Sequence, residues 1–346
     1  MKRIVAQELD PSPIWPHTLK YHPVSGALIA TGAVPGEEGG HYVAVWTEKT
    51  SKPTQYYKRE RPCDEGTEFA FSCDGKLAAI ASACKGDKIC VYDATTFALL
   101  KTVPLFQPPY KKTPSGVTVK SCWISAEPVF SPEKTRETSL IIPDASGYLR
   151  LCNVATGQVK EYIGLRNGTM INFFAFLTLN NDALSQANDA SGGVPNRWIV
   201  GGVDRLSVGG PESNAATTYF FKDDMSWEHV WLGKRRRVLS VAARGPKEGR
   251  GKIVIRPETL DGPREESFQK IPGTVAFLRY SERDDLVAMA LTGGSILLWD
   301  VKTRSLFGKI PSGGDLIRAM EFSPVESSLT VLYANNRIID YKYDVS

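Results

Sequence analysis

The sequence lacks the short motifs that mark common catalytic and cofactor sites. Its 346 residues contain no G-x-S-x-G, no H-E-x-x-H and no G-x-x-x-x-G-K-[ST] pattern. The glycine-rich stretch 201–210 has neither the lysine nor the following helix of a phosphate-binding loop, so we interpret it as a strand end and a loop. We therefore expect no catalytic residues and no cofactor.

Metal ligands are scarce and widely spaced. The chain has four histidines and six cysteines, no two cysteines form a C-x-x-C pair, and the last 194 residues contain no cysteine. Structural zinc sites need closely paired ligands, so we expect no metal site. Cys90 and Cys152 lie in apolar segments, where we expect each to pack as a free thiol.

Long apolar segments are also missing. No run approaches about 18 apolar residues, which predicts no membrane-spanning helix. The N-terminal segment MKRIVAQELDPSP lacks the apolar stretch of a secretory signal. Together with the expected free thiols, these features favour a location in the cytoplasm, the nucleus or both.

The composition is that of a folded protein with a sizeable core, because 42% of the residues are hydrophobic and 23% are charged. The net charge of +4 is too small an excess for a nucleic-acid-binding surface over the whole molecule.

Internal repeats are the strongest signal in the sequence. Four segments share one order of features: 67–103, 127–163, 274–310 and 316–345. Each begins with an apolar strand that ends in an F-S-P or F-S-x-D-G type of turn, and a strand of small residues and a tight polar turn follow. A third strand then ends in a pair such as Trp299-Asp300 or Tyr92-Asp93. Each unit is predicted to be one small antiparallel sheet, which buries both faces only against neighbouring copies.

These features resemble the WD-repeat β-propellers. Leu298-Trp299-Asp300 is the best copy of the family's Trp-Asp dipeptide, and the similarity is weak only between Met170 and Ile271. The Gly-His dipeptide that precedes the first strand in this family is missing throughout. The resemblance implies an all-β fold and scaffold or adaptor roles in multiprotein complexes.

The length predicts one seven-bladed propeller of four-stranded antiparallel blades over residues 1–346. Seven blades give 49 residues each, close to the usual ~40–45, whereas six would need 58. We place the blades at roughly 12–60, 66–104, 123–164, 170–233, 236–272, 274–311 and 316–345. In this scheme EHVWLG (228–233) ends the fourth blade. The N-terminal strand at 2–9 completes the last blade and closes the ring.

Positive charge is concentrated in one segment. Residues 234–256 contain nine basic residues and one acid, Glu248. We expect the run 234–237 in the loop that enters the fifth blade, on the same face as Trp15 and the insertion 104–121. This run suits an acidic or phosphate-bearing partner or a nuclear-import signal, and a solvated loop is the simple alternative.

Loops on a rigid scaffold are where binding concentrates. Trp15 is a candidate anchor because tryptophan offers a large contact area at low entropy cost, although it can equally plug the central channel. The candidate partner-binding residues are Trp15, His17, Arg59, Arg61, Tyr110, Lys111, Lys112, Lys234, Arg235, Arg236 and Arg237.

We interpret the chain as a monomeric, non-catalytic scaffold or adaptor whose partners are other proteins. One alternative is a propeller enzyme of the lactonase or esterase type with a cation in the central channel, for which Glu68 and Glu127 are candidate ligands. Another is a propeller that binds nucleic acid or anionic lipid through the basic fifth blade.

Overall fold

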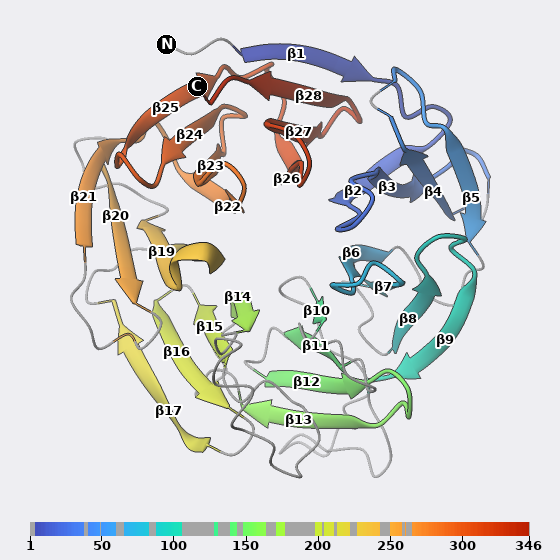
Figure 1. Cartoon of the computed structure of the whole chain (residues 1–346), viewed down its shortest axis with the longest axis horizontal. Coiled ribbons are helices and arrows are strands. Elements are labelled where there is room, and N and C mark those ends of the chain that lie inside the picture. The colour runs from blue at the N-terminus through green and yellow to red at the C-terminus, as the bar shows by residue number, and fades with distance from the viewer. Residues whose placement is uncertain are drawn as a thin grey trace. The chain divides into compact units, whose positions relative to one another are not determined.

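The computed structural model describes residues 4–37, 41–48, 50–59, 66–82, 88–105, 128–130, 139–143, 148–163, 171–176, 198–202, 204–210, 213–221, 227–242, 250–257, 260 and 265–345. They form seven four-stranded antiparallel sheets, so the chain has the seven blades of a β-propeller, as the repeats predicted (Figure 1). Within the described ranges the only helix is a single 3-10 turn, η2 (Gly233–Arg235). The blades divide into two compact units, Met1–Arg59 with Asp223–Ser346, and Glu60–Lys222.

The first unit contains four blades. The first blade consists of β2 (Trp15–Tyr21), β3 (Leu28–Ala33), β4 (His41–Trp46) and β5 (Gln55–Arg59). The fifth consists of β18 (Trp227–Leu232), β19 (Arg237–Ala242), β20 (Arg250–Pro257) and β21 (Glu265–Lys270). The sixth consists of β22 (Val275–Ser281), β23 (Leu286–Leu291), β24 (Ile296–Asp300) and β25 (Ser305–Ile310). The seventh consists of β26 (Ile317–Phe322), β27 (Ser328–Tyr333), β28 (Ile338–Tyr343) and β1 (Ile4–Leu9).

The N-terminal strand β1 is the outer strand of the seventh blade (Figure 1). It pairs antiparallel with β28 along its whole length, from Ile4 opposite Tyr343 to Leu9 opposite Ile338. Leu9 is fully buried in a core that the first and seventh blades share. The predicted completion of the last blade by the N-terminal strand is therefore confirmed.

The second unit contains three blades. The second blade consists of β6 (Gly66–Phe71), β7 (Leu77–Ser82), β8 (Lys88–Asp93) and β9 (Leu99–Pro104). The third consists of β10 (Val129–Phe130), β11 (Ser139–Pro143), β12 (Tyr148–Asn153) and β13 (Val159–Ile163). The fourth consists of β14 (Ile171–Phe176), β15 (Trp198–Gly202), β16 (Arg205–Gly210) and β17 (Ser213–Phe220).

The second strand of a blade is the most apolar because both of its faces pack against other side chains. Every residue of β23 and of β27 is buried, which explains continuous runs such as LVAMAL where a half-exposed strand would alternate. The predicted tight turns are also present. Gly75, Gly294 and Asn336 adopt φ values of 70°, 78° and 68°.

The strand assignment at the junction of the fourth and fifth blades was wrong. Segment 228–233 does not end the fourth blade, because β18 pairs with β19 and forms the innermost strand of a complete fifth blade. For the stretch 201–210, the predicted strand end is confirmed, because residues 201–202 end β15, but the predicted loop is wrong, because residues 205–210 form the strand β16. The glycines that suggested a loop lie near strand ends, while Leu206 and Val208 between them are buried.

The cysteines differ from expectation at one position. Cys152 is a free, buried thiol, and desolvation raises its pKa to about 11. Cys73 is exposed and is not part of a disulfide. Cys90 is disulfide-bonded, so the expectation of a free thiol there is wrong. An apolar strand context does not reveal whether a second cysteine lies within the few ångströms that a disulfide requires.

Candidate functional site

A cavity opens beside Trp15, where the chain passes from the seventh blade to the first. Its volume is about 360 Å³, and it is lined by residues 8–12, 14 and 15 and by the 335–337 turn between β27 and β28. Trp15 opens strand β2, and 55% of its surface is exposed. The lining mixes apolar side chains with charged ones. We call this the Trp15 cavity.

Hydrogen bonds hold the connection 10–14 in place. The Asp10 N–H donates to the carbonyl of Ser51 at 2.6 Å, and the Ile14 N–H donates to the carbonyl of Pro11 at 3.1 Å. The Tyr56 hydroxyl donates to the carbonyl of Ser12. Ile14 is 2% exposed and packs in the core of the first and seventh blades. This wall of the cavity is therefore attached to the scaffold at several points.

Gly32 allows the backbone of Trp15 to approach β3 closely. A Cβ atom at position 32 would lie 2.1 Å from the carbonyl oxygen of Trp15, which no side chain tolerates. The approach coincides with a β-bulge between Pro16 and Thr18. Bulges re-aim the side chains beside them, and this one lies next to the exposed indole.

Two carboxylates and one guanidinium line the Trp15 cavity. Arg337 donates from Nε and Nη2 to the two carboxylate oxygens of Glu8, at 2.9 and 3.1 Å. This hydrogen-bonded pair holds the pKa of Glu8 below its usual range. Asp10 accepts hydrogen bonds from the Ser12 hydroxyl and from the Ser12 N–H, the latter at 2.9 Å, and they lower the pKa of Asp10. Both carboxyl groups are therefore ionised at neutral pH.

The basic run 234–237 lies elsewhere in the same unit. Its first three residues lie in the turn between β18 and β19, and Arg237 is the first residue of β19. The run therefore follows the far end of an inner strand, whereas Trp15 begins one. Contacts link this turn to the corresponding turns of the other blades in the first unit. Arg235 pairs with Asp285 of the sixth blade, and Arg283 donates to the carbonyl of Val325 in the seventh.

The turn between β2 and β3 of the first blade contacts the seventh-blade turn in the same way. A Cβ atom at Gly26 would lie 2.7 Å from a methyl group of Val325. The turns that follow the inner strands of all four blades therefore lie next to one another, on one face of this unit. Trp15 and the run 234–237 lie at opposite ends of the inner strands, and the expectation that they share a face is wrong. The error follows from assigning β18 to the fourth blade.

Most of the described contacts of the basic run are internal. Arg235 donates to both carboxylate oxygens of Asp285, and Asp285 also accepts the Tyr280 hydroxyl at 2.9 Å. Arg237 pairs with Glu265, which Arg304 also contacts, at 2.6 Å. Two of the four cations thus join strands and blades within the first unit. Lys234 is exposed.

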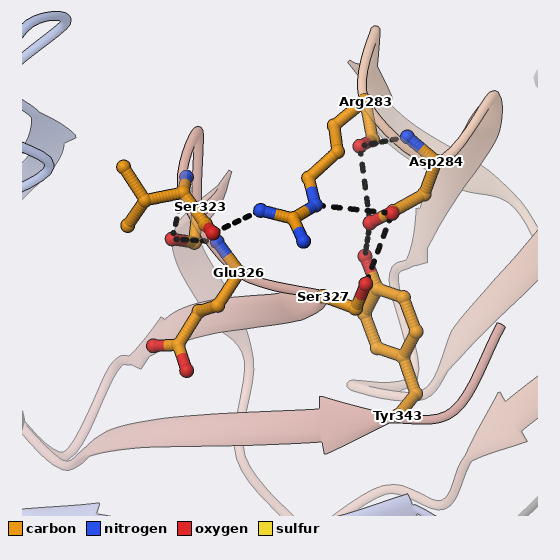
Figure 2. A network of polar contacts seen from close by, with 8 residues as sticks. Arg283, Asp284, Ser323, Glu326, Ser327 and Tyr343 are labelled. Carbon is orange, nitrogen blue, oxygen red and sulfur yellow. Dashed lines mark hydrogen bonds and ion pairs between the residues drawn. The ribbon is translucent and has the colours of Figure 1, made fainter.

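Figure 2 shows a second network of polar contacts at this end of the unit, between the sixth and seventh blades. Asp284 accepts hydrogen bonds from the Ser327 hydroxyl at 3.0 Å and from the Tyr343 hydroxyl at 2.8 Å. Its side chain is only 5% exposed. Burial and the neighbouring Asp284 raise the pKa of Tyr343, so this hydroxyl stays protonated and donates. We interpret the network as structural, because its buried groups are turned toward one another.

The other candidate residues are only partly placed. In the first blade, Trp15 lies opposite Ala33, Ala33 opposite His41, and His41 opposite Arg59, so Trp15 and Arg59 lie at the same end of the blade. His17 is half-buried in β2. Four candidates lie outside the described residues: Arg61, Tyr110, Lys111 and Lys112.

The inner strands of the first unit carry charged groups that sequence reasoning missed. Glu321 of β26 accepts Lys20 of β2 at 2.6 Å and Arg279 of β22 at 3.1 Å, so one carboxylate joins three blades. Each of these three residues directly precedes an aromatic residue near the end of its inner strand. An alignment of the repeats with one another would have shown this shared position. Glu228 of β18 lies near Arg279, and burial raises the pKa of Glu228 to about 7.

Within the ranges that the structure describes, no group of three or more His, Cys, Asp or Glu side chains is placed to hold a metal ion. Of the two carboxylates considered for a channel cation, Glu68 lies in β6 and Glu127 is outside the described residues. In the described part of the chain, no helix has the length and apolar character needed to cross a membrane.

Comparisons with known proteins do not assign the chain to a family. No protein-family model and no curated protein matches the chain.

Proposed function

We propose that this chain is a non-catalytic interaction platform, a scaffold or adaptor subunit that binds partner proteins at the Trp15 cavity. The observation that carries the proposal is an exposed tryptophan beside a cavity whose walls are hydrogen-bonded to the scaffold. A preformed surface lowers the entropy cost of binding, and tryptophans of this kind often dominate interface energies.

Membership of the WD-repeat family is part of the proposal. Leu298-Trp299-Asp300 ends the third strand of a four-stranded blade, at the position typical of the family. The indole N–H groups of Trp46 and Trp299 are buried and have no hydrogen-bond partner among the described residues. The Gly-His dipeptides of the family are also missing, so the member that we propose is a divergent one. A monomer located in the cytoplasm or nucleus is the setting that we propose for it.

A pull-down from native extract tests the proposal. We expect a stoichiometric protein partner with the native chain and its loss with Trp15→Ala. Val24→Ala is the matched control, because Val24 is also an exposed apolar residue (64%) but lies beyond the opposite end of β2. A partner that survives Trp15→Ala, or the absence of any protein partner, would contradict the proposal.

A further inference from the structure

We propose that the Trp15 cavity binds a basic side chain, lysine or arginine, from an extended segment of a partner protein. The inference rests on the proposed function and specifies the ligand chemistry at the same site. It is carried by the size of the cavity, the charge of its lining and the exposed indole.

The size of the cavity limits the occupant. A volume of about 360 Å³ is at the lower end of the range for ligand pockets, roughly 300–1,000 Å³. One long side chain with its backbone fits this space, whereas a folded domain or a large cofactor does not.

Two carboxylates and one guanidinium line the cavity, and the Arg318 guanidinium contacts its wall from outside by donating to the side-chain oxygen of Asn336 at 3.1 Å. Glu8, Asp10 and Arg337 are the ionisable residues of the lining, and Arg337 is bound to Glu8 through two hydrogen bonds. Asp10 is thus the carboxylate that this guanidinium does not neutralise. Hydrogen bonds from Ser12 keep Asp10 ionised, and the effect of Lys52 on the pKa of Asp10 is smaller than theirs. A cation is the complementary ligand.

Trp15 supplies the second half of the recognition. An ammonium or guanidinium group is attracted to the face of an exposed indole, and its aliphatic stem packs on the same ring. An exposed indole and an ionised carboxylate that line one small cavity favour a cation over a neutral or acidic group. Leu316, 61% exposed, extends the surface beyond the turn, because its carbonyl accepts the N–H of Ala334 at 2.8 Å. An apolar residue of the partner close to the basic one fits there.

Selection from a random decapeptide library tests the inference. The full chain and its Trp15→Ala variant are immobilised in parallel, and we expect peptides that bind only the native chain to be enriched in lysine or arginine at one position. Changing that residue to alanine should weaken binding about tenfold in fluorescence polarisation, as should Trp15→Ala. Peptides no richer in basic residues than the starting library would overturn the inference.

Asp10→Asn separates charge from shape. Asparagine retains an oxygen that accepts the Ser12 N–H, so the connection keeps its geometry while the charge is lost. We expect this variant to weaken the selected peptide about fivefold and to reduce the salt dependence of binding. Glu282→Gln removes an exposed carboxylate at the other end of an inner strand and should change neither quantity. Equal binding by the Asp10→Asn and native proteins would contradict a basic ligand.

The two proposals fail in different ways. Selected peptides that depend on Trp15 but carry no basic residue would overturn the ligand class and leave the platform intact. A full-length partner that binds Trp15→Ala as well as the native chain would remove the platform at this site, whatever the peptides show.

Discussion

Glu228 is a carboxyl group that the fold keeps partly protonated near neutral pH. Burial raises its pKa from the ordinary value of 4.5 to about 7, and the opposing effect of Arg279 is smaller. Between these two pH values the folded protein binds more protons than the unfolded chain. The contribution of Glu228 to stability is therefore fully present below pH 4.5 and is lost as the pH rises toward 7.

Glu228→Gln should remove this dependence. At pH 8 we expect the variant to exceed the native chain in free energy of unfolding by up to about 3 kcal/mol, and at pH 4 the two should be equal. Urea unfolding between pH 4 and 8 measures the difference. Glu282→Gln, at an exposed position, should follow the native chain throughout. A native-like pH profile for Glu228→Gln would show that the carboxyl group is ionised in the fold.

Residues whose role is local were predictable. Gly75, Gly294 and Asn336 lie in the tight turns that their residue types favour. The contact between Lys20 and Glu321 was not predictable, because 301 positions separate the two residues. Only the packing of the first blade against the seventh brings them together.

Strand β1 tests how one element stabilises its unit. Removing residues 1–9 uncovers the edge of β28, deletes the fully buried Leu9 and breaks the pair between Glu8 and Arg337. The loss of one buried leucine already costs about 2–5 kcal/mol. We expect the melting temperature to fall by at least about 5 °C in calorimetry.

A point variant serves as the control for that truncation. Glu8→Gln removes the ion pair alone, and at this exposed position it should cost less than about 1 kcal/mol. A truncated chain that melts like the native one would show that β1 is not needed to complete the blade.

The sequence alone could not predict the boundary between the fourth and fifth blades, because the boundary depends on which strands pair. A strand is assigned to a blade by its pairing partner, and the WEHVWL segment has the pattern of either an outer or an inner strand. Its pairing with β19 settles the assignment. The placement of the basic run followed from the wrong choice.

At the scale of the whole molecule, the distribution of charge distinguishes the proposed platform from a surface that binds nucleic acid or anionic lipid. The net charge is only +4, and two cations of the most basic turn form ion pairs with Asp285 and Glu265. A surface that binds nucleic acid or anionic lipid needs cations that neutralise phosphates, and each phosphate contact steepens the salt dependence of binding. Cations already paired with carboxylates contribute less to such a surface.

Two single substitutions in that turn, Arg235→Gln and Lys234→Gln, compare these roles. Each removes one positive charge, but only Arg235 makes the two-oxygen contact with Asp285. We expect Arg235→Gln to lower the free energy of unfolding by about 1 kcal/mol and Lys234→Gln to leave it unchanged. On heparin we expect weak retention of the native chain with a shallow salt dependence, and little change in either variant. The opposite result is strong retention that falls steeply with salt and that Lys234→Gln reduces without a change in stability. It would favour an anionic ligand over the platform, because the cations of this turn would then bind a ligand and not only neighbouring carboxylates.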